Sequence, residues 1–329
     1  MQVELALPLG ESDFVDGLAK ILRTVSAITR EIARPRPHPI STPSAPRPRP
    51  KVGLALGGGF ARGMAHIGVL KVFEEEKIPI DFVAGTSIGA AIGAAYCSGV
   101  SAKELQEIAS ILKFSDFARW TISRMGLCTN DRLGALLKKM LKVYTFEELR
   151  IPLCVSATDF LTGESVVFKT GPLIDPVRAS CAYPGVFLPV SVNGRLMVDG
   201  LLAHPVPATP LKQMGADRVA AVYFNSHWVG SNGPKHFMDI IGQCFSIAQA
   251  NMCSLWQVNA DVVIEPDVAP FPYDAFSKAP ELVKVGEAAA RAALPAIQAW
   301  FKEPEVAPAI ARAIDTKKSF SPATLPAAS

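Results

Sequence analysis

The stretch VGLALGGGFARGMAHIGVL, residues 52–70, constrains the fold of this chain more than any other part of its sequence. An apolar run meets three consecutive glycines and then an arginine, and apolar residues afterwards recur at helical spacing. A strand, a glycine loop and a helix in this order bring the backbone very close to something negative, because glycine has no side chain and a helix N-terminus is partly positive. That negative group is either a nucleotide phosphate or charge that develops only during a reaction.

The phosphate alternative fits the loop poorly. The dinucleotide fingerprint Gly-x-Gly-x-x-Gly fails from Gly57 and from Gly58, because Arg62 and Phe60 stand where a glycine is needed. The fingerprint also requires an acidic residue at the end of the second strand, whereas Asp81 begins the second predicted strand. A nucleotide-binding module therefore stays an alternative that the spacing does not favour.

The motif GTSIG, residues 85–89, lies between a predicted strand and a predicted helix of small residues. Gly-x-Ser-x-Gly in this context is typical of a nucleophile elbow, in which a sharp turn lifts the serine hydroxyl out of the sheet. The alternative role for Ser87 is that of a helix cap. About thirty residues separate the motif from the glycine loop, and the pair is far more specific than either motif alone.

The glycine loop has a second interpretation beside such a serine. Attack on an ester carbonyl creates an oxyanion, and each backbone amide aimed at it contributes roughly 3–4 kcal/mol. The amides of Gly57, Gly58 and Gly59 can converge without side chains in the way, so we predict that they form an oxyanion hole. Arg62 follows near the helix start, where it either holds the loop or meets a substrate phosphate.

A serine nucleophile needs a base, and the segment MVDGLLAHPVP supplies two candidates. Asp199 closes a short predicted strand and is followed by glycine, which suits a carboxylate that faces the site. Either Asp199 is itself the base, or it orients His204 in a triad. The remaining histidines have no chemical feature beside them and are His38, His66, His227 and His236.

Four segments carry a family resemblance: GGGFARGMAHIGVL, GTSIGA, ASCAYPGVFLPV and VDG, and the hairpin ATDFLTGESVVF adds to it. Together they resemble the patatin-like phospholipases, in particular a small bacterial group related to the catalytic domain of neuropathy target esterase. The resemblance spans about residues 51–300, in the family's order. It implies a three-layer α/β sandwich with a central, mostly parallel sheet flanked by helices, and the alternation of predicted strands and helices agrees with this fold.

The resemblance also implies an activity and its residues. A Ser-Asp dyad hydrolyses the ester of a phospholipid or lysophospholipid through an acyl-enzyme, with no metal or cofactor. By position Ser87 matches the nucleophile, Asp199 the base and Gly57 to Gly59 the oxyanion loop. Two residues depart from the family: Phe60 stands where the family usually has a small residue, and His204 where relatives usually have a polar residue such as asparagine. The bulk of Phe60 is expected to narrow or gate the site. The histidine at position 204 leaves a Ser-His-Asp triad as an alternative to the dyad.

The chain divides into four parts by composition. Residues 1–34 predict an amphipathic helix, which docks on the main domain or on a partner, or lies on an anionic membrane surface. Residues 35–50 hold seven prolines and predict an extended linker. The catalytic domain is expected over residues 51–303 and an Ala/Pro-rich tail over 304–329. The linker and helix also suit a regulatory protein that acts through partners on the same fold.

Periodicity and turn residues place the elements of the main domain. Strands are predicted at residues 52–56, 81–85, 153–159, 165–168, 196–198, 219–224 and 262–265, and helices at 66–76, 88–98, 105–112, 131–142, 236–258 and 281–301. Two uncharged runs, 82–102 and 240–260, are interpreted as buried core and not as membrane spans.

Composition narrows the partners. The net charge of +3 and the lack of a nucleic-acid motif argue against a nucleic-acid partner. Six scattered cysteines predict reduced thiols in a cytoplasmic protein, and we find no secretory signal. The aromatic stretch 114–127 carries two arginines and is either a lid, a lipid contact or ordinary packing. Peripheral contact with the inner membrane face is therefore expected through the N-terminal helix or residues 114–127, and the oligomeric state stays open.

Overall fold

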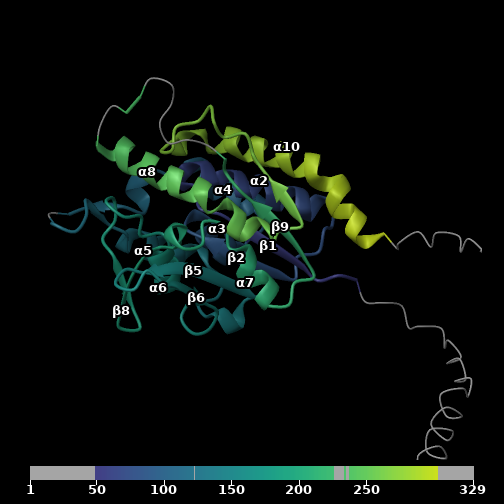
Figure 1. The fold of residues 1–329 in the computed structure, drawn as a ribbon, viewed down its shortest axis with the longest axis horizontal. Coiled ribbons are helices and arrows are strands. Elements are labelled where there is room, and N and C mark those ends of the chain that lie inside the picture. The colour runs from purple at the N-terminus through teal and green to yellow at the C-terminus, as the bar shows by residue number, and fades with distance from the viewer. Residues whose placement is uncertain (1–48, 122, 226–232, 235–236, 303–329) are drawn as a thin grey trace, which may run out of the picture. The chain divides into compact units, whose positions relative to one another are not determined.

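A computed structural model of the chain describes residues 49–121, 123–225, 233–234 and 237–302 (Figure 1). The predicted N-terminal helix, the linker up to residue 48 and the predicted tail lie outside the described residues. His38, His227 and His236 lie outside them as well. The glycine loop, the GTSIG motif and Asp199 all lie within the described part.

An eight-stranded mixed sheet organises the described domain. Its strands in spatial order are β10 (Val262–Ile264), β9 (Arg218–Val222), β1 (Val52–Leu56), β2 (Phe82–Thr86), β5 (Leu153–Asp159), β8 (Arg195–Asp199) and β7 (Val190–Val192), and β6 (Ser165–Phe168) also pairs with β5. From β10 to β5 all neighbours are parallel, whereas β6, β7 and β8 pair antiparallel. This confirms the predicted central parallel sheet and the predicted β5–β6 hairpin.

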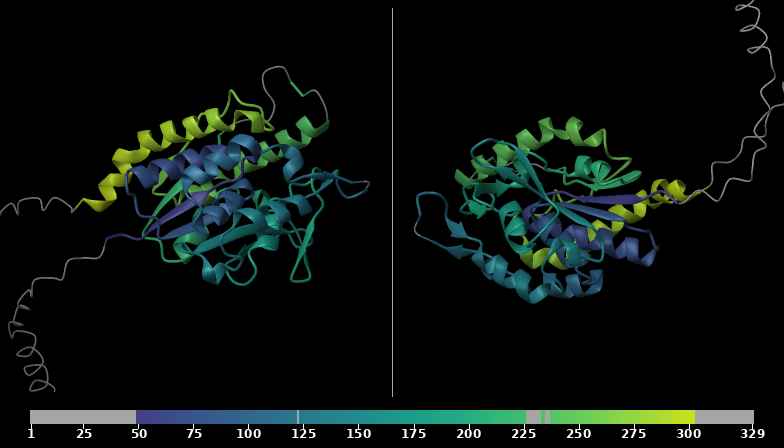
Figure 2. Two further views of the ribbon diagram at one scale, coloured as in Figure 1. Left: turned by 180° about the vertical axis from the view of Figure 1, so that it is seen from behind. Right: turned by 90° about the horizontal axis from the view of Figure 1, so that it is seen from below.

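Helices cover both faces of the sheet, which explains why its parallel strands are mostly apolar. One face carries α2 (Ala65–Glu75), α3 (Ile88–Cys97), α4 (Ala102–Ile111) and α10 (Ala279–Gln298), and the other carries α7 (Ala208–Gln213) and α9 (Cys253–Gln257). Along β1, Leu54 and Leu56 belong to the first core and Ala55 to the second. Figure 2 (left) shows α10, in yellow, lying along α2. The three predicted layers are thus present.

Several elements surround the site at the antiparallel side of the sheet, and most of them were not predicted. They are β3 (Arg119–Trp120), β4 (Cys128–Thr129), α5 (Asp131–Met140), α6 (Ile174–Ser180) and α8 (Phe237–Asn251). Of these, only α5 and α8 correspond to predicted helices. The short helix α6 contacts β5, β7 and β8, and it therefore ties the strand that ends in Asp199 to the middle of the sheet.

The second uncharged run corrects one prediction. Residues 240–260 form α8 and α9 instead of one helix, and they lie at the surface: only Gly242 and Trp256 are buried. Ile240 and Ile247 are exposed by 56% and 51%. The absence of charge predicted burial, but small and amide side chains allow an uncharged helix to stay in water. Within the described residues, no helix is both long and apolar enough to cross a bilayer.

Candidate active site

Ser87 lies at a sharp turn between β2 and α3, as the motif predicts. Its φ of 56° and ψ of −126° are unusual for a non-glycine residue, and such strain costs of order 1–3 kcal/mol where the surroundings hold it in place. The flanking glycine is required, because a Cβ at Gly89 would lie 2.2 Å from the Leu56 carbonyl oxygen. The turn lets α3 start against β1, with Ser87 at its N-terminus.

Asp199 lies at the end of β8 and reaches Ser87 directly. The Ser87 hydroxyl donates a hydrogen bond of 2.6 Å to Asp199 Oδ2. The other carboxylate oxygen, Oδ1, accepts from the Leu201 amide at 3.0 Å. Asp199 has no exposed surface, and Thr158 fixes its backbone through a hydrogen bond from Oγ1 to the Asp199 carbonyl. A serine and a carboxylate from distant parts of the chain therefore form a buried, directly bonded pair.

Burial changes the chemistry of this carboxylate. Loss of water raises the pKa of Asp199 to about 7, and the hydrogen bonds from Ser87 and Leu201 oppose the rise. An ordinary carboxylate, with a pKa near 4, is a poor base for a serine hydroxyl. A pKa close to neutrality combines ionisation with real proton affinity, which is what a general base requires.

The pH dependence of activity follows from this pKa. With Asp199 as the predicted base, we expect kcat/KM for an uncharged ester to rise by about tenfold per pH unit on the acid side and to level off above about pH 7, because only an ionised carboxylate can accept a proton. Release of p-nitrophenol or fatty acid between about pH 5 and pH 9 measures this. A flat profile across that range would contradict a base with a pKa near 7.

Ser180 is a positioning residue that the sequence analysis missed. Its Oγ accepts from the Ser87 amide at 2.8 Å and donates to the Ser156 carbonyl at 2.7 Å. The hydroxyl thus joins the elbow to β5 through α6. The segment ASCAYPGVFLPV contains this serine and belongs to the family resemblance, but nothing in its pattern distinguished Ser180 from its neighbours.

The three glycine amides have different partners. Gly57 donates to the Val222 carbonyl at 3.2 Å and Gly58 to the Pro205 carbonyl at 3.1 Å. Within the described part of the chain, the Gly59 amide has no such acceptor. This narrows the predicted oxyanion hole to Gly59. It also speaks against a phosphate cradle, which would use several amides of the loop together.

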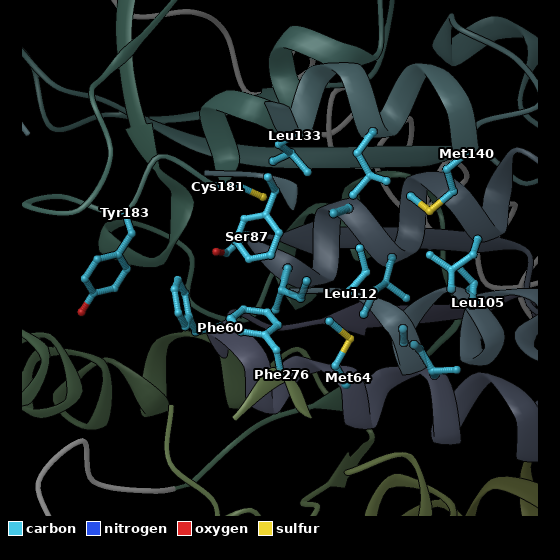
Figure 3. A pocket seen from close by; sticks show the side chains of 18 of the residues that line it. Phe60, Met64, Ser87, Leu105, Leu112, Leu133, Met140, Cys181, Tyr183 and Phe276 are labelled. Atoms are coloured by element: carbon cyan, nitrogen blue, oxygen red, sulfur yellow. The ribbon is translucent and has the colours of Figure 1, made fainter. Parts of the chain in front are cut away.

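Two compartments meet at Ser87. The first has about 830 Å³ of empty space including its open mouth, and apolar side chains dominate its lining. Figure 3 shows it extending from Ser87 and Phe60 towards Leu105 and Met140. The second has about 550 Å³, and its described lining combines aromatic rings with hydroxyl and amide groups, including Tyr223, Ser246 and Gln249. The Ser87 side chain thus lies between an apolar and a polar space.

Comparison with known families decides the class of domain. Residues 54–212 match the model of the patatin-like phospholipase family. The chain carries a patatin-like phospholipase domain. An uncharacterized NTE family protein of Mycobacterium tuberculosis is 38% identical over 196 residues, which cover 55% of this chain and 51% of that protein. Lysophospholipase NTE1 of Kluyveromyces lactis is 30% identical over 52% of this chain and 12% of its own length.

Two further proteins are similar to this chain. Patatin-like phospholipase domain-containing protein 6 of Mus musculus is 34% identical over 52% of this chain and 13% of its own length. The crystal structure of VipD from Legionella pneumophila covers 77% of this chain and 67% of that chain, with a TM-score of 0.48 and 15% identity. The chain spans about half the length of the mycobacterial relative and about an eighth of the yeast and mouse proteins.

Arg62 of the patatin-like domain is almost fully buried, with 4% of its surface exposed. Its Nε donates to the Phe271 carbonyl at 2.7 Å, and its guanidinium stacks on the Tyr273 ring at 3.8 Å. Burial lowers the pKa of Arg62. Of its two predicted roles, this environment favours holding the glycine loop, here against the segment before α10; contact with a substrate phosphate stays a prediction.

Two histidines brace the patatin-like domain without reaching Asp199. His66 Nε2 bonds to the Gly57 carbonyl at 2.8 Å, and burial lowers the pKa of His66 to about 4. His204 Nδ1 bonds to Ser165 Oγ at 2.8 Å, and the His204 carbonyl accepts from Thr86 Oγ1 at 2.7 Å. Because both Asp199 oxygens are engaged by other donors, the structure does not support the triad. His204 instead supports the elbow through its backbone.

Histidine, cysteine and carboxylate side chains can also bind metal ions. Across the described ranges, no group of three or more His, Cys, Asp or Glu side chains is arranged to hold a metal ion.

Proposed function

We propose that this chain is a serine lipid acyl hydrolase of the phospholipase A or lysophospholipase type, with Ser87 as nucleophile and Asp199 as base. The observation that carries the proposal is the 2.6 Å hydrogen bond from the Ser87 hydroxyl to a fully buried Asp199, with Ser87 lining an apolar compartment. A buried carboxylate close to neutral pKa can take a proton from serine, and the apolar space suits an acyl chain.

The chemistry proceeds in two steps. Asp199 takes the Ser87 proton while Oγ attacks the ester carbonyl, and the tetrahedral intermediate then expels the alcohol, which receives that proton from Asp199. Water next attacks the acyl-enzyme, again with Asp199 as base. The fatty acid leaves and Ser87 recovers its proton. Water, the ester and the dyad supply every atom and proton that the two steps transfer, so the cycle closes.

The oxyanion of each tetrahedral intermediate needs donors close to Ser87. Gly59 lines the polar compartment beside Ser87, and the first turn of α3 adds amides without intrahelical acceptors together with its partial positive charge. We assign Gly59 and the α3 N-terminus to this role. Gly57 and Gly58 support it by fixing the loop to β9 and to Pro205.

The two compartments assign the two halves of the substrate. The apolar compartment takes the acyl chain, because each buried methylene contributes about 0.8 kcal/mol. The polar compartment takes the glycerol portion of the leaving group, since its lining offers Ser246 and Gln249. The yeast relative is named a lysophospholipase, which supports a lysophospholipid as substrate.

The β3–β4 hairpin is the proposed contact with a lipid surface. Trp120 and Met125 are exposed by 72% and 60%, and Arg119 and Arg124 lie beside them. Aromatic and aliphatic side chains interleaved with arginine suit the interface of an anionic membrane. Contact through the N-terminal helix stays a prediction, because that segment lies outside the described residues.

Fatty-acid release tests the function. The purified full chain is expected to release fatty acid from a panel of lysophospholipids, diacylphospholipids and monoacylglycerols, with turnover independent of added chelator. Liquid chromatography with mass spectrometry identifies both products and the ester bond attacked. A chain that releases no fatty acid from any ester of the panel would contradict the proposal.

A further inference from the structure

Phe60 is the residue of the glycine loop that neither the dyad nor the oxyanion hole requires. Its φ of 50° is in the left-handed region, which bulky side chains rarely adopt. The ring centroid lies 6.0 Å from that of Phe114 and 5.5 Å from that of Phe276. Because Phe114 and Phe276 come from different parts of the chain, the Phe60 ring is held by tertiary packing and not by its own loop alone.

The position of this ring relative to the two compartments is informative. Among the described residues, Ser87, Phe60 and Tyr183 line both compartments, and every other lining residue belongs to one. Figure 3 shows Phe60 between Tyr183 and Phe276, with Ser87 close by. Ser87 therefore lies at the junction, and the rings of Phe60 and Tyr183 bound the apolar space where it meets the polar one; of these two rings, Phe60 belongs to the glycine loop.

We propose that the Phe60 ring is the wall between the acyl compartment and the leaving-group compartment, and that it restricts the site to esters with a single acyl chain. The proposal rests on the proposed function. A second chain on the leaving group begins in the polar compartment, beside Ser246 and Gln249, where its methylenes gain little from burial. With the wall in place that chain cannot cross into the apolar space. Phe60 is therefore a specificity-determining residue.

Chain selectivity is the readout that separates a wall from ordinary packing. The ratio of kcat/KM for oleoyl lysophosphatidylcholine to that for dioleoyl phosphatidylcholine, both in mixed micelles, measures it. We expect Phe60→Ala and Phe60→Gly to lower this ratio by at least about tenfold, because the second chain gains access to the apolar compartment. Glycine adopts a positive φ freely, so Phe60→Gly removes the ring without keeping the backbone strain.

Phe117→Ala is the matched control. Phe117 also packs on Phe276, at 5.0 Å between ring centroids, but it lines the apolar compartment alone. Its truncation enlarges the acyl site without opening the wall, so we expect it to change the preferred chain length and to leave the single-chain to double-chain ratio within about threefold of wild type. Phe60→Leu retains bulk and is expected to keep the wild-type ratio within the same limit.

The outcomes are distinguishable. A ratio that stays at the wild-type value in both Phe60→Ala and Phe60→Gly, while either variant still hydrolyses p-nitrophenyl butyrate, overturns the wall and leaves the hydrolase standing. Equal losses of selectivity in Phe60→Ala and Phe117→Ala overturn it too, because a general loosening of the aromatic cluster would then explain both. A wild-type chain without activity on any ester instead contradicts the proposed function.

Discussion

Replacing Ser87 with alanine is expected to lower kcat/KM for ester hydrolysis by about 10⁴-fold or more, because the variant lacks the hydroxyl that we propose forms the acyl-enzyme. The variant lacks the hydroxyl that donates a 2.6 Å hydrogen bond to Asp199. Residual hydrolysis would come from the oxyanion donors and substrate binding alone. Steady-state fatty-acid release from a lysophospholipid measures the change.

The control for this variant is Ser165→Ala. Ser165 is a half-buried serine that, like Ser87, forms a hydrogen bond with another side chain, here His204, but it lies on β6 and lines neither compartment. The two variants remove the same atom. Full activity in Ser87→Ala, or equal losses in both variants, would remove Ser87 from the mechanism.

Replacing Asp199 with asparagine is expected to lower kcat/KM by about 10³-fold to 10⁴-fold, because the amide has nearly the same shape but cannot accept the serine proton. His204→Ala is expected to retain most of the activity, since the His204 imidazole bonds to Ser165 and not to Asp199. Rates on p-nitrophenyl butyrate, with thermal unfolding to verify the fold, measure both. The reverse order of losses would restore the triad that the geometry argues against.

The same variant has a signature in stability. Burial raises the pKa of Asp199 to about 7 in the folded protein, above its value in the unfolded chain. The folded state therefore binds the Asp199 proton more tightly than the unfolded chain does. The protonated carboxyl adds to the free energy of unfolding below about pH 4, and this contribution is lost as the pH rises through about 7. The Asp199→Asn variant does not lose this stability at high pH, because an amide does not ionise. The Tm of the variant relative to wild type is expected to be higher at pH 8 than at pH 5, and calorimetry at the two pH values measures the difference.

The pairing of Ser87 with Asp199 and the fold were predictable because their sequence signals are local. The GTSIG motif needs only a strand before it and a helix after it, and both are visible in hydrophobic periodicity. Asp199 was recognisable from its place at a strand end before glycine and from the family resemblance. The alternation of strands and helices along the sequence predicted a mostly parallel sheet, and the strands β10, β9, β1, β2 and β5 form it.

The parts that were not predictable depend on contacts between distant segments. From the sequence, the amides of Gly57 and Gly58 were expected to be free to bind an oxyanion. Their hydrogen-bond acceptors, the carbonyls of Val222 and Pro205, lie more than a hundred residues further along the chain. The separation of His204 from Asp199 depends on the pairing of β5 with β6 and β8, which brings Ser165 to the imidazole. The uncharged run 240–260 was interpreted as core because charge marks a solvated face, whereas only Gly242 and Trp256 of this run are buried in the structure.

Covalent labelling tests the central claim most directly. A fluorophosphonate probe reacts with a serine that a neighbouring base activates, and mass spectrometry of the digested protein locates the adduct. The account predicts one adduct, on the peptide that contains Ser87, with labelling absent in Ser87→Ala and strongly slowed in Asp199→Asn. A wild-type chain that stays unlabelled, or a Ser87→Ala variant that labels equally, would contradict it.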